Sequence, residues 1–73
     1  MSKLVTMLRK SAEADKAKAL LSLDLLENKA VGIGDHSTED FYKNAEEALI
    51  KLVDADDRIE ALEKYFPPTK EVI

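Results

Sequence analysis

Apolar residues recur at alternating spacings of four and three through the second half of the chain, with no polar exception between residues 38 and 66. A seven-residue repeat of this kind is typical of a helix that packs against another helix along one seam. The pattern therefore predicts a helix over residues 38–66. Its seam positions are Phe41, Ala45, Ala48, Leu52, Ala55, Ile59, Leu62 and Phe66.

The first half of the chain shows the same periodicity less regularly, and it predicts a helix over residues 3–31. Polar residues at Asp15 and Lys16 interrupt the apolar face. The face shifts by one position at Leu23, because a 3.6-residue period drifts against a 3.5-residue seam. The apolar face comprises Val5, Leu8, Ala12, Ala19, Leu23, Leu26 and Ala30.

A glycine-containing corner over residues 32–37 separates the two expected helices, within the stretch "GIGDHSTED". Gly32 suits the left-handed conformation that commonly ends a helix. Ser37 suits the N-cap of the next helix, and Asp40 follows three residues later as in a capping box. Because a short corner makes consecutive helices antiparallel, the expected fold is all-α, an antiparallel two-helix hairpin resembling a coiled coil.

The antiparallel register predicts which residues face each other across the seam. Their numbers add to about 67–69, which places Ala12 near Ala55 and Ala19 near Ala48. Small residues then face small residues. Two prolines end the second helix, so the tail over residues 67–73 is expected to be extended.

A second group of apolar residues lies away from the seam. Two helices touch along one stripe only, so this group would leave an apolar patch larger than a soluble monomer usually exposes. We therefore expect a homodimer in which two hairpins, parallel or antiparallel to each other, form a four-helix bundle. The expected dimer interface comprises Met7, Leu20, Leu21, Leu25, Ile50 and Val53.

Composition and charge narrow the class of partner. Residues 1–31 carry six basic and four acidic groups, a net +2, whereas residues 37–66 carry four basic and nine acidic groups, a net −5. An acidic chain without a long basic run argues against nucleic-acid binding. The chain has no cysteine, no apolar run long enough for a bilayer and no apolar signal core at its start. We expect a cytoplasmic protein of a bacterial or phage-infected cell, with no membrane partner.

The acidic residues of the second helix offer an alternative function. Asp54, Asp57 and Glu46 or Glu47 would be the ligands of a small metal- or nucleotide-dependent helical-bundle hydrolase. None of them lies in the seam, where a bundle metal site projects. Acids also precede basic residues by four positions, as Asp54 precedes Arg58, which is favourable on an exposed helix. We therefore favour the interpretation that these acids form a solvent-exposed face of the helix over the hydrolase alternative. No catalytic, cofactor-binding or metal-binding residue is predicted.

The corner holds the only histidine, His36, next to Asp35. One histidine and one carboxylate are too few for a tight metal site, although they suit a pH-sensitive contact or a hydrogen bond to a helix end. The glycines lack the preceding strand and the third glycine of a dinucleotide loop. The sequence therefore indicates Asp35 and His36 as a possible contact for a protein partner.

The stretches "AVGIGDHSTEDF" and "ALIKLVDADDRIEALEKYF" resemble small uncharacterised proteins of marine tailed phages and marine metagenomes. The resemblance covers residues 19–66, with matching positions at Gly32, Gly34, Asp35 and His36. It implies a compact phage-encoded accessory protein that acts by contact rather than chemistry. The expected function is a self-associating interaction or adaptor module without catalytic activity.

Overall fold

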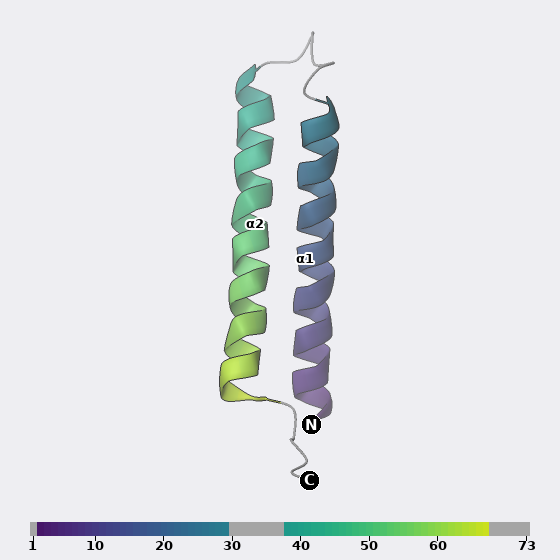
Figure 1. Cartoon of the computed structure of the whole chain (residues 1–73), viewed down its shortest axis with the longest axis vertical. Helices are drawn as coiled ribbons and strands as arrows, with labels where there is room; N and C mark the ends of the chain where they lie inside the picture. The colour runs from purple at the N-terminus through teal and green to yellow at the C-terminus, as the bar shows by residue number, and fades with distance from the viewer. Residues whose placement is uncertain (1, 30–37, 68–73) are drawn as a thin grey trace.

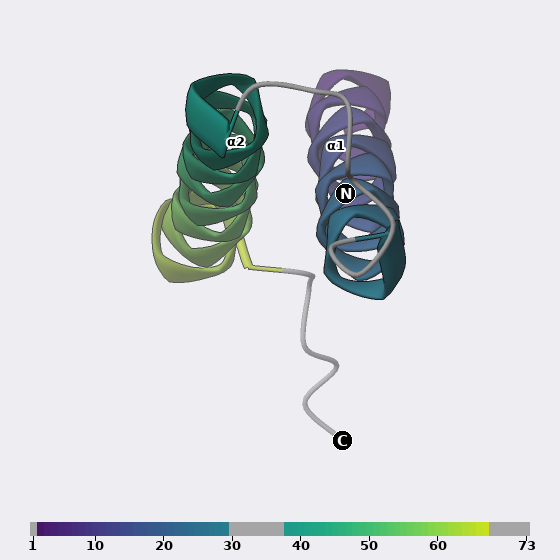
Figure 2. The same ribbon diagram turned by 90° about the horizontal axis from the view of Figure 1, so that it is seen from above.

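Two long helices make up the described part of the chain. The computed structural model describes residues 2–29 and 38–67, and these residues form α1 (Lys3–Lys29) and α2 (Thr38–Tyr65). The two helices lie side by side and run in opposite directions (Figure 1; Figure 2). The predicted all-α antiparallel hairpin is confirmed.

The helix boundaries agree closely with those expected from the periodicity. The second helix ends at Tyr65, one residue earlier than predicted, so Phe66 follows the helix. Residues 30–31 of the first predicted helix, the corner over residues 32–37 and the tail over residues 68–73 lie outside the described residues.

The beginnings of both helices carry groups that satisfy or complement free backbone N–H groups. The Ser2 hydroxyl oxygen accepts a hydrogen bond from the Val5 backbone N–H at 3.0 Å, and the Ser2 carbonyl accepts one from the Thr6 N–H at 3.0 Å. Ser2 is thus the N-cap of α1. Glu39 and Asp40 lie in the first turn of α2, where negative charge interacts favourably with the helix dipole.

The core is a line of small residues between the helices. Ala12 and Ala55 are fully buried, at 0% exposure each. The buried hydrophobic residues of the described chain are Ala12, Ala19, Ala48, Ala55 and Leu62. All five belong to the predicted seam, which is confirmed at these positions.

Larger seam residues are only half-buried, because two helices meet along a single line and a long side chain extends past it. This applies to Val5, Leu23, Leu26, Phe41, Leu52 and Ile59, as well as to the smaller Ala45. Leu8 is 41% exposed and Phe66 is 54% exposed. The predicted burial of Phe66 in the seam is wrong, because α2 ends before it and the residue that follows is a proline that cannot continue the helix.

Two ion pairs fix the register of the helices. Arg9 Nη1 lies 3.4 Å from Glu63 Oε2, and Lys16 Nζ lies 2.9 Å from Asp56 Oδ1. From the first pair to the second, the chain advances by seven residues on α1 and retreats by seven on α2, as an antiparallel seven-residue repeat requires. The side chains are partly exposed, so these pairs report the register more than they stabilise it.

Candidate functional site

The hairpin has two long edges, one on each side of the line of alanines. Asp15 and Lys16 are consecutive, hence about 100° apart around α1, and they project toward opposite edges. One edge carries the ion pairs Arg9–Glu63 and Lys16–Asp56, and we call it the ion-pair edge. The other carries Asp15 and an open groove between the helices, and we call it the groove edge.

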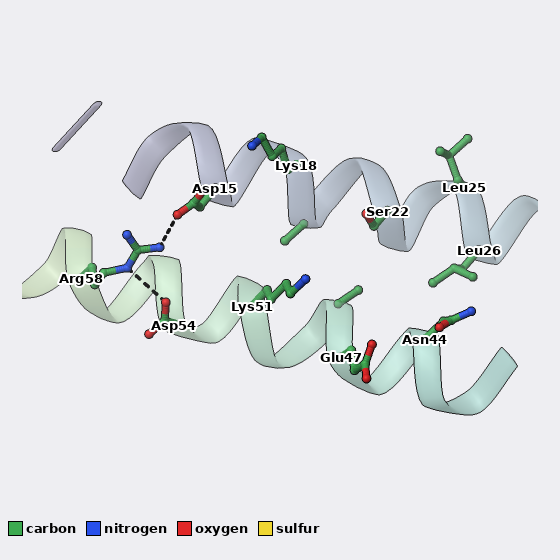
Figure 3. Close-up of a pocket in the computed structure, with 12 residues that line it drawn as sticks. Asp15, Lys18, Ser22, Leu25, Leu26, Asn44, Glu47, Lys51, Asp54 and Arg58 are labelled. Carbon is green, nitrogen blue, oxygen red and sulfur yellow. Dashed lines mark hydrogen bonds and ion pairs between the residues drawn. The ribbon is translucent and has the colours of Figure 1, made fainter. Parts of the chain in front are cut away.

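The groove has a volume of about 760 Å³ and is lined by side chains from both helices (Figure 3). Its floor is apolar and includes the small residues Ala19 and Ala48. Its rim is mostly polar or charged. The lining residues are Asp15, Lys18, Ala19, Ser22, Leu25, Leu26, Asn44, Glu47, Ala48, Lys51, Asp54 and Arg58.

One end of the groove is closed by an arginine held between two carboxylates (Figure 3). The Arg58 Nη2 group donates to Asp15 Oδ2 at 2.7 Å across the hairpin. The Arg58 Nε group donates to Asp54 Oδ2 at 3.1 Å, one turn earlier on the same helix. The predicted ion pair between Asp54 and Arg58 is confirmed. The same guanidinium also links α2 to α1 through Asp15.

This arrangement shifts two titration equilibria. The hydrogen bond from Arg58 holds the pKa of the Asp15 carboxyl below its usual value of 3.8, and the charges of Arg58, Lys18 and Lys51 act in the same direction. The hydrogen bond to Asp15 in turn raises the pKa of Arg58, with a further contribution from Asp54. Both groups are solvent-accessible, so they stay ionised near neutral pH.

The charges that line the groove cancel. Lys18, Lys51 and Arg58 are balanced by three carboxylates, those of Asp15, Glu47 and Asp54. A neutral groove with alternating charges does not favour a strongly anionic or cationic small molecule. Its mixture of apolar floor and paired charges is closer to a surface that receives another helix.

The six residues predicted for the dimer interface do not share one face. Leu25 belongs to the groove edge of α1, where it lines the groove. Met7 lies five positions from the buried Ala12 and Leu21 lies two from the buried Ala19, so both project from the outer side of α1 next to that edge. Leu20 follows Lys16 by four residues and therefore lies on the ion-pair edge. Their assignment to the dimer interface stays a prediction.

The two α2 residues of that set, Ile50 and Val53, do not line the groove. Val53 lies two positions from the buried Ala55 and five from the buried Ala48, so it projects from the outer side of α2 next to the ion-pair edge. Ile50 lies between the two edges on the outer side of α2, two positions from the buried Ala48 and five from the buried Ala55. All six residues are nevertheless exposed, from 47% for Leu20 to 66% for Ile50.

The carboxylates considered as metal ligands are not brought together. Within residues 2–29 and 38–67, no three histidine, cysteine or carboxylate side chains lie close enough to hold a metal ion. Asp54 is instead engaged by Arg58. The corner residues Asp35 and His36 lie outside the described residues, so their predicted partner contact stays a prediction.

Sequence reasoning missed the contact between Asp15 and Arg58. The sequence pattern marks Asp15 only as an interruption of the apolar face, and Arg58 only as a partner of Asp54. The signal was present, since opposite charges stand close together once Ala12 is placed against Ala55. The side chain of Arg9 is only 16% exposed, and its Nη2 atom is buried without a hydrogen-bond partner among the described residues.

Comparison with known proteins adds no relative. No protein-family model, no curated protein and no solved structure matches the chain. Neither described helix contains a stretch that is both long and apolar enough to cross a membrane.

Proposed function

We propose that this chain is a self-associating interaction module, in which two hairpins form a four-helix bundle that contacts another protein. The observation that carries the proposal is the distribution of large hydrophobic side chains. Twelve of them in the described residues are at least 41% exposed, whereas Leu62 is the large one counted as buried. Soluble monomers rarely leave so much apolar surface uncovered.

The small core supports the same proposal. Four of the five buried hydrophobic residues are alanines, and each buried methyl group contributes only about 0.8 kcal/mol. Small folds usually need a disulfide, a metal or self-association to be stable. The chain has no cysteine, and a second hairpin would cover the exposed leucines.

The likeness of the corner and second helix to small phage proteins supports an accessory protein that acts by contact, in the cytoplasm and without catalysis. The outer acidic face of α2 and the corner residues Asp35 and His36 are the surfaces proposed for the protein partner. The overall negative charge of −4 favours neither nucleic acid nor an anionic membrane as that partner.

The test of self-association is the mass in solution, measured by light scattering behind a sizing column over a wide concentration range. We expect about twice the chain mass of 8.2 kDa, persisting on dilution. A folded monomer at every concentration would contradict the proposal.

The absence of metal-dependent catalysis is tested separately, by thermal melting with and without Mg²⁺. A built metal site would raise the melting temperature progressively with Mg²⁺ concentration. We expect no such rise, and a saturable rise would favour the hydrolase alternative.

A further inference from the structure

A second seven-residue series runs along α1, between its groove edge and its outer side. Residues 4, 7, 11, 14, 18, 21, 25 and 28 follow at alternating spacings of three and four. Leu4, Met7, Leu21 and Leu25 of this series are 49–62% exposed. These large apolar residues lie toward the two ends of the series, with Ser11, Ala14 and Lys18 between them, and we call this stripe the second seam.

The groove edge of α2 carries charges of alternating sign. Glu47, Lys51, Asp54 and Arg58 follow at spacings of three or four, and all four line the groove. Because the series has four charges of alternating sign, each charge meets one of opposite sign when the same series from a second copy runs in the reverse direction. When a second copy runs antiparallel, Glu47 of one copy opposes Arg58 of the other, and Lys51 opposes Asp54.

We propose that the groove edge is where a second copy of this chain docks, with its helices antiparallel to those of the first. α1 then packs against α1 through the second seam, and α2 faces α2 through the alternating charges. The inference rests on the proposed self-association, and it assigns the face and the direction that the sequence left open.

The lysine within the second seam selects the antiparallel direction. In a parallel arrangement Lys18 would lie against Lys18 of the other copy, and each α2 charge would meet its own sign. An antiparallel alignment that sets Met7 against Leu25 places Lys18 against Ala14, where the long lysine stem covers a small residue. Like charges in direct opposition disfavour the parallel form.

The geometry of the edge yields a closed bundle. The second seam lies about 130° around α1 from the line of alanines that faces α2, because its positions follow the alanine positions by two and by six residues of the heptad. A second hairpin related by a two-fold axis then brings its own α2 over the first α2. A closed arrangement of four helices results, with the groove covered in both copies.

The ion-pair edge is the weaker candidate for this contact. Its charges are taken up by the ion pairs Arg9–Glu63 and Lys16–Asp56. Its exposed apolar side chains, among them Leu20, are confined to the half of the hairpin beyond those pairs. On the groove edge Arg58 holds Asp15 and Asp54, but Glu47 and Lys51 form no ion pair among the described residues. The second seam offers large apolar side chains toward both ends of α1.

Neighbouring leucines give a matched test. Leu21→Lys places a charge in the second seam, whereas Leu20→Lys places the same charge on the ion-pair edge. The side chains are 58% and 47% exposed in the hairpin, so both variants should fold. We expect light scattering to show a monomer for Leu21→Lys and a dimer for Leu20→Lys, with equal helix content by circular dichroism.

The outcomes separate the inference from the proposed function. If the wild type is dimeric and Leu20→Lys dissociates, or Leu21→Lys stays dimeric, then the groove edge is not the interface, while self-association still stands. A wild type that is monomeric throughout overturns both.

A second test uses mixing, and it does not depend on the fold of the leucine variants. In the antiparallel dimer, Lys51→Glu alone places a carboxylate opposite Asp54 of the other copy, at two symmetric positions. Asp54→Lys alone places an ammonium group opposite Lys51 of the other copy. We expect each to weaken the homodimer by about tenfold. An equimolar mixture should restore binding as a heterodimer, seen by native mass spectrometry.

The control is Lys43→Glu, an equal charge reversal outside the groove, which should leave the dissociation constant unchanged. A mixture in which the Lys51→Glu and Asp54→Lys chains form no excess of heterodimer would overturn the antiparallel pairing of α2 with α2.

Discussion

At the scale of single residues, the hairpin depends on side chains that are small enough to let two backbones meet. Ala12 and Ala55 are fully buried, and a buried methyl group there touches the opposite helix rather than solvent. Close packing leaves no space for further methylene groups. The sequence predicted this layer, because the alternating spacing and the antiparallel register together specify which residues face each other.

Replacing Ala12 by leucine should therefore destabilise the hairpin. The added methylene groups push the helices apart, at a cost of about 1–3 kcal/mol. Urea denaturation followed by circular dichroism measures the change. Ala17→Leu, on an exposed position of the same helix, is the matched control and should change stability little. An equal effect in both variants would contradict the packing explanation.

The contact between Asp15 and Arg58 predicts a pH dependence. The pKa of Asp15 in the folded protein lies below its usual value of 3.8, so its ionised form is favoured by folding. The contribution is complete well above 3.8 and is lost as the pH falls through the lower pKa of the folded state. Asp15→Asn should thus melt below the wild type at neutral pH, and the difference should vanish in strong acid.

The control for that experiment is Asp24→Asn, which removes an exposed carboxylate that forms no ion pair among the described residues. It should not reproduce the loss at neutral pH. A gap between Asp15→Asn and the wild type that persists unchanged at the lowest pH would show that the Arg58 contact is not its source.

At the scale of the helices, periodicity was enough to predict the seam but not the contact between Asp15 and Arg58 or the groove beside it. The repeat in α2 indicated the burial of Ala48, Ala55 and Leu62 because backbone geometry alone brings every seventh residue to one face. The groove was not predicted, since it depends on how far Asp15 and Arg58 reach past the seam. Long side chains have many rotamers, which the repeat does not specify.

The register of α1 against α2 is testable through Lys16 and Asp56, whose charged atoms are 2.9 Å apart. Lys16→Asp and Asp56→Lys should each lower the melting temperature slightly, and the double exchange should recover it. The side chains are 42% and 51% exposed, so the coupling energy is expected to be about 0.2–1 kcal/mol. A double-mutant cycle with zero coupling would contradict the register.

At the scale of the whole molecule, twelve large hydrophobic side chains of the described hairpin are exposed, whereas the buried core consists of four alanines and Leu62. The helices contact each other along one line, so Leu21 and Leu25 remain 58% and 49% exposed. The sequence indicated this excess correctly, since the first helix is apolar on more than one side. It did not indicate how the excess divides between two edges, because that division follows from the position of the partner helix.

An association that covers this surface links folding to concentration. If dimerisation stabilises the folded chain, mass action makes the free energy of unfolding, per mole of dimer, rise by about 1.4 kcal/mol for each tenfold increase in protein concentration. For a protein of this size the melting temperature should therefore rise by several degrees per tenfold increase. Scanning calorimetry or circular dichroism over a hundredfold concentration range measures the effect. Leu21→Lys should melt at a temperature that does not depend on concentration, because its hairpin unfolds alone. A concentration-independent wild type would mean that the second seam of α1 adds nothing to stability through self-association.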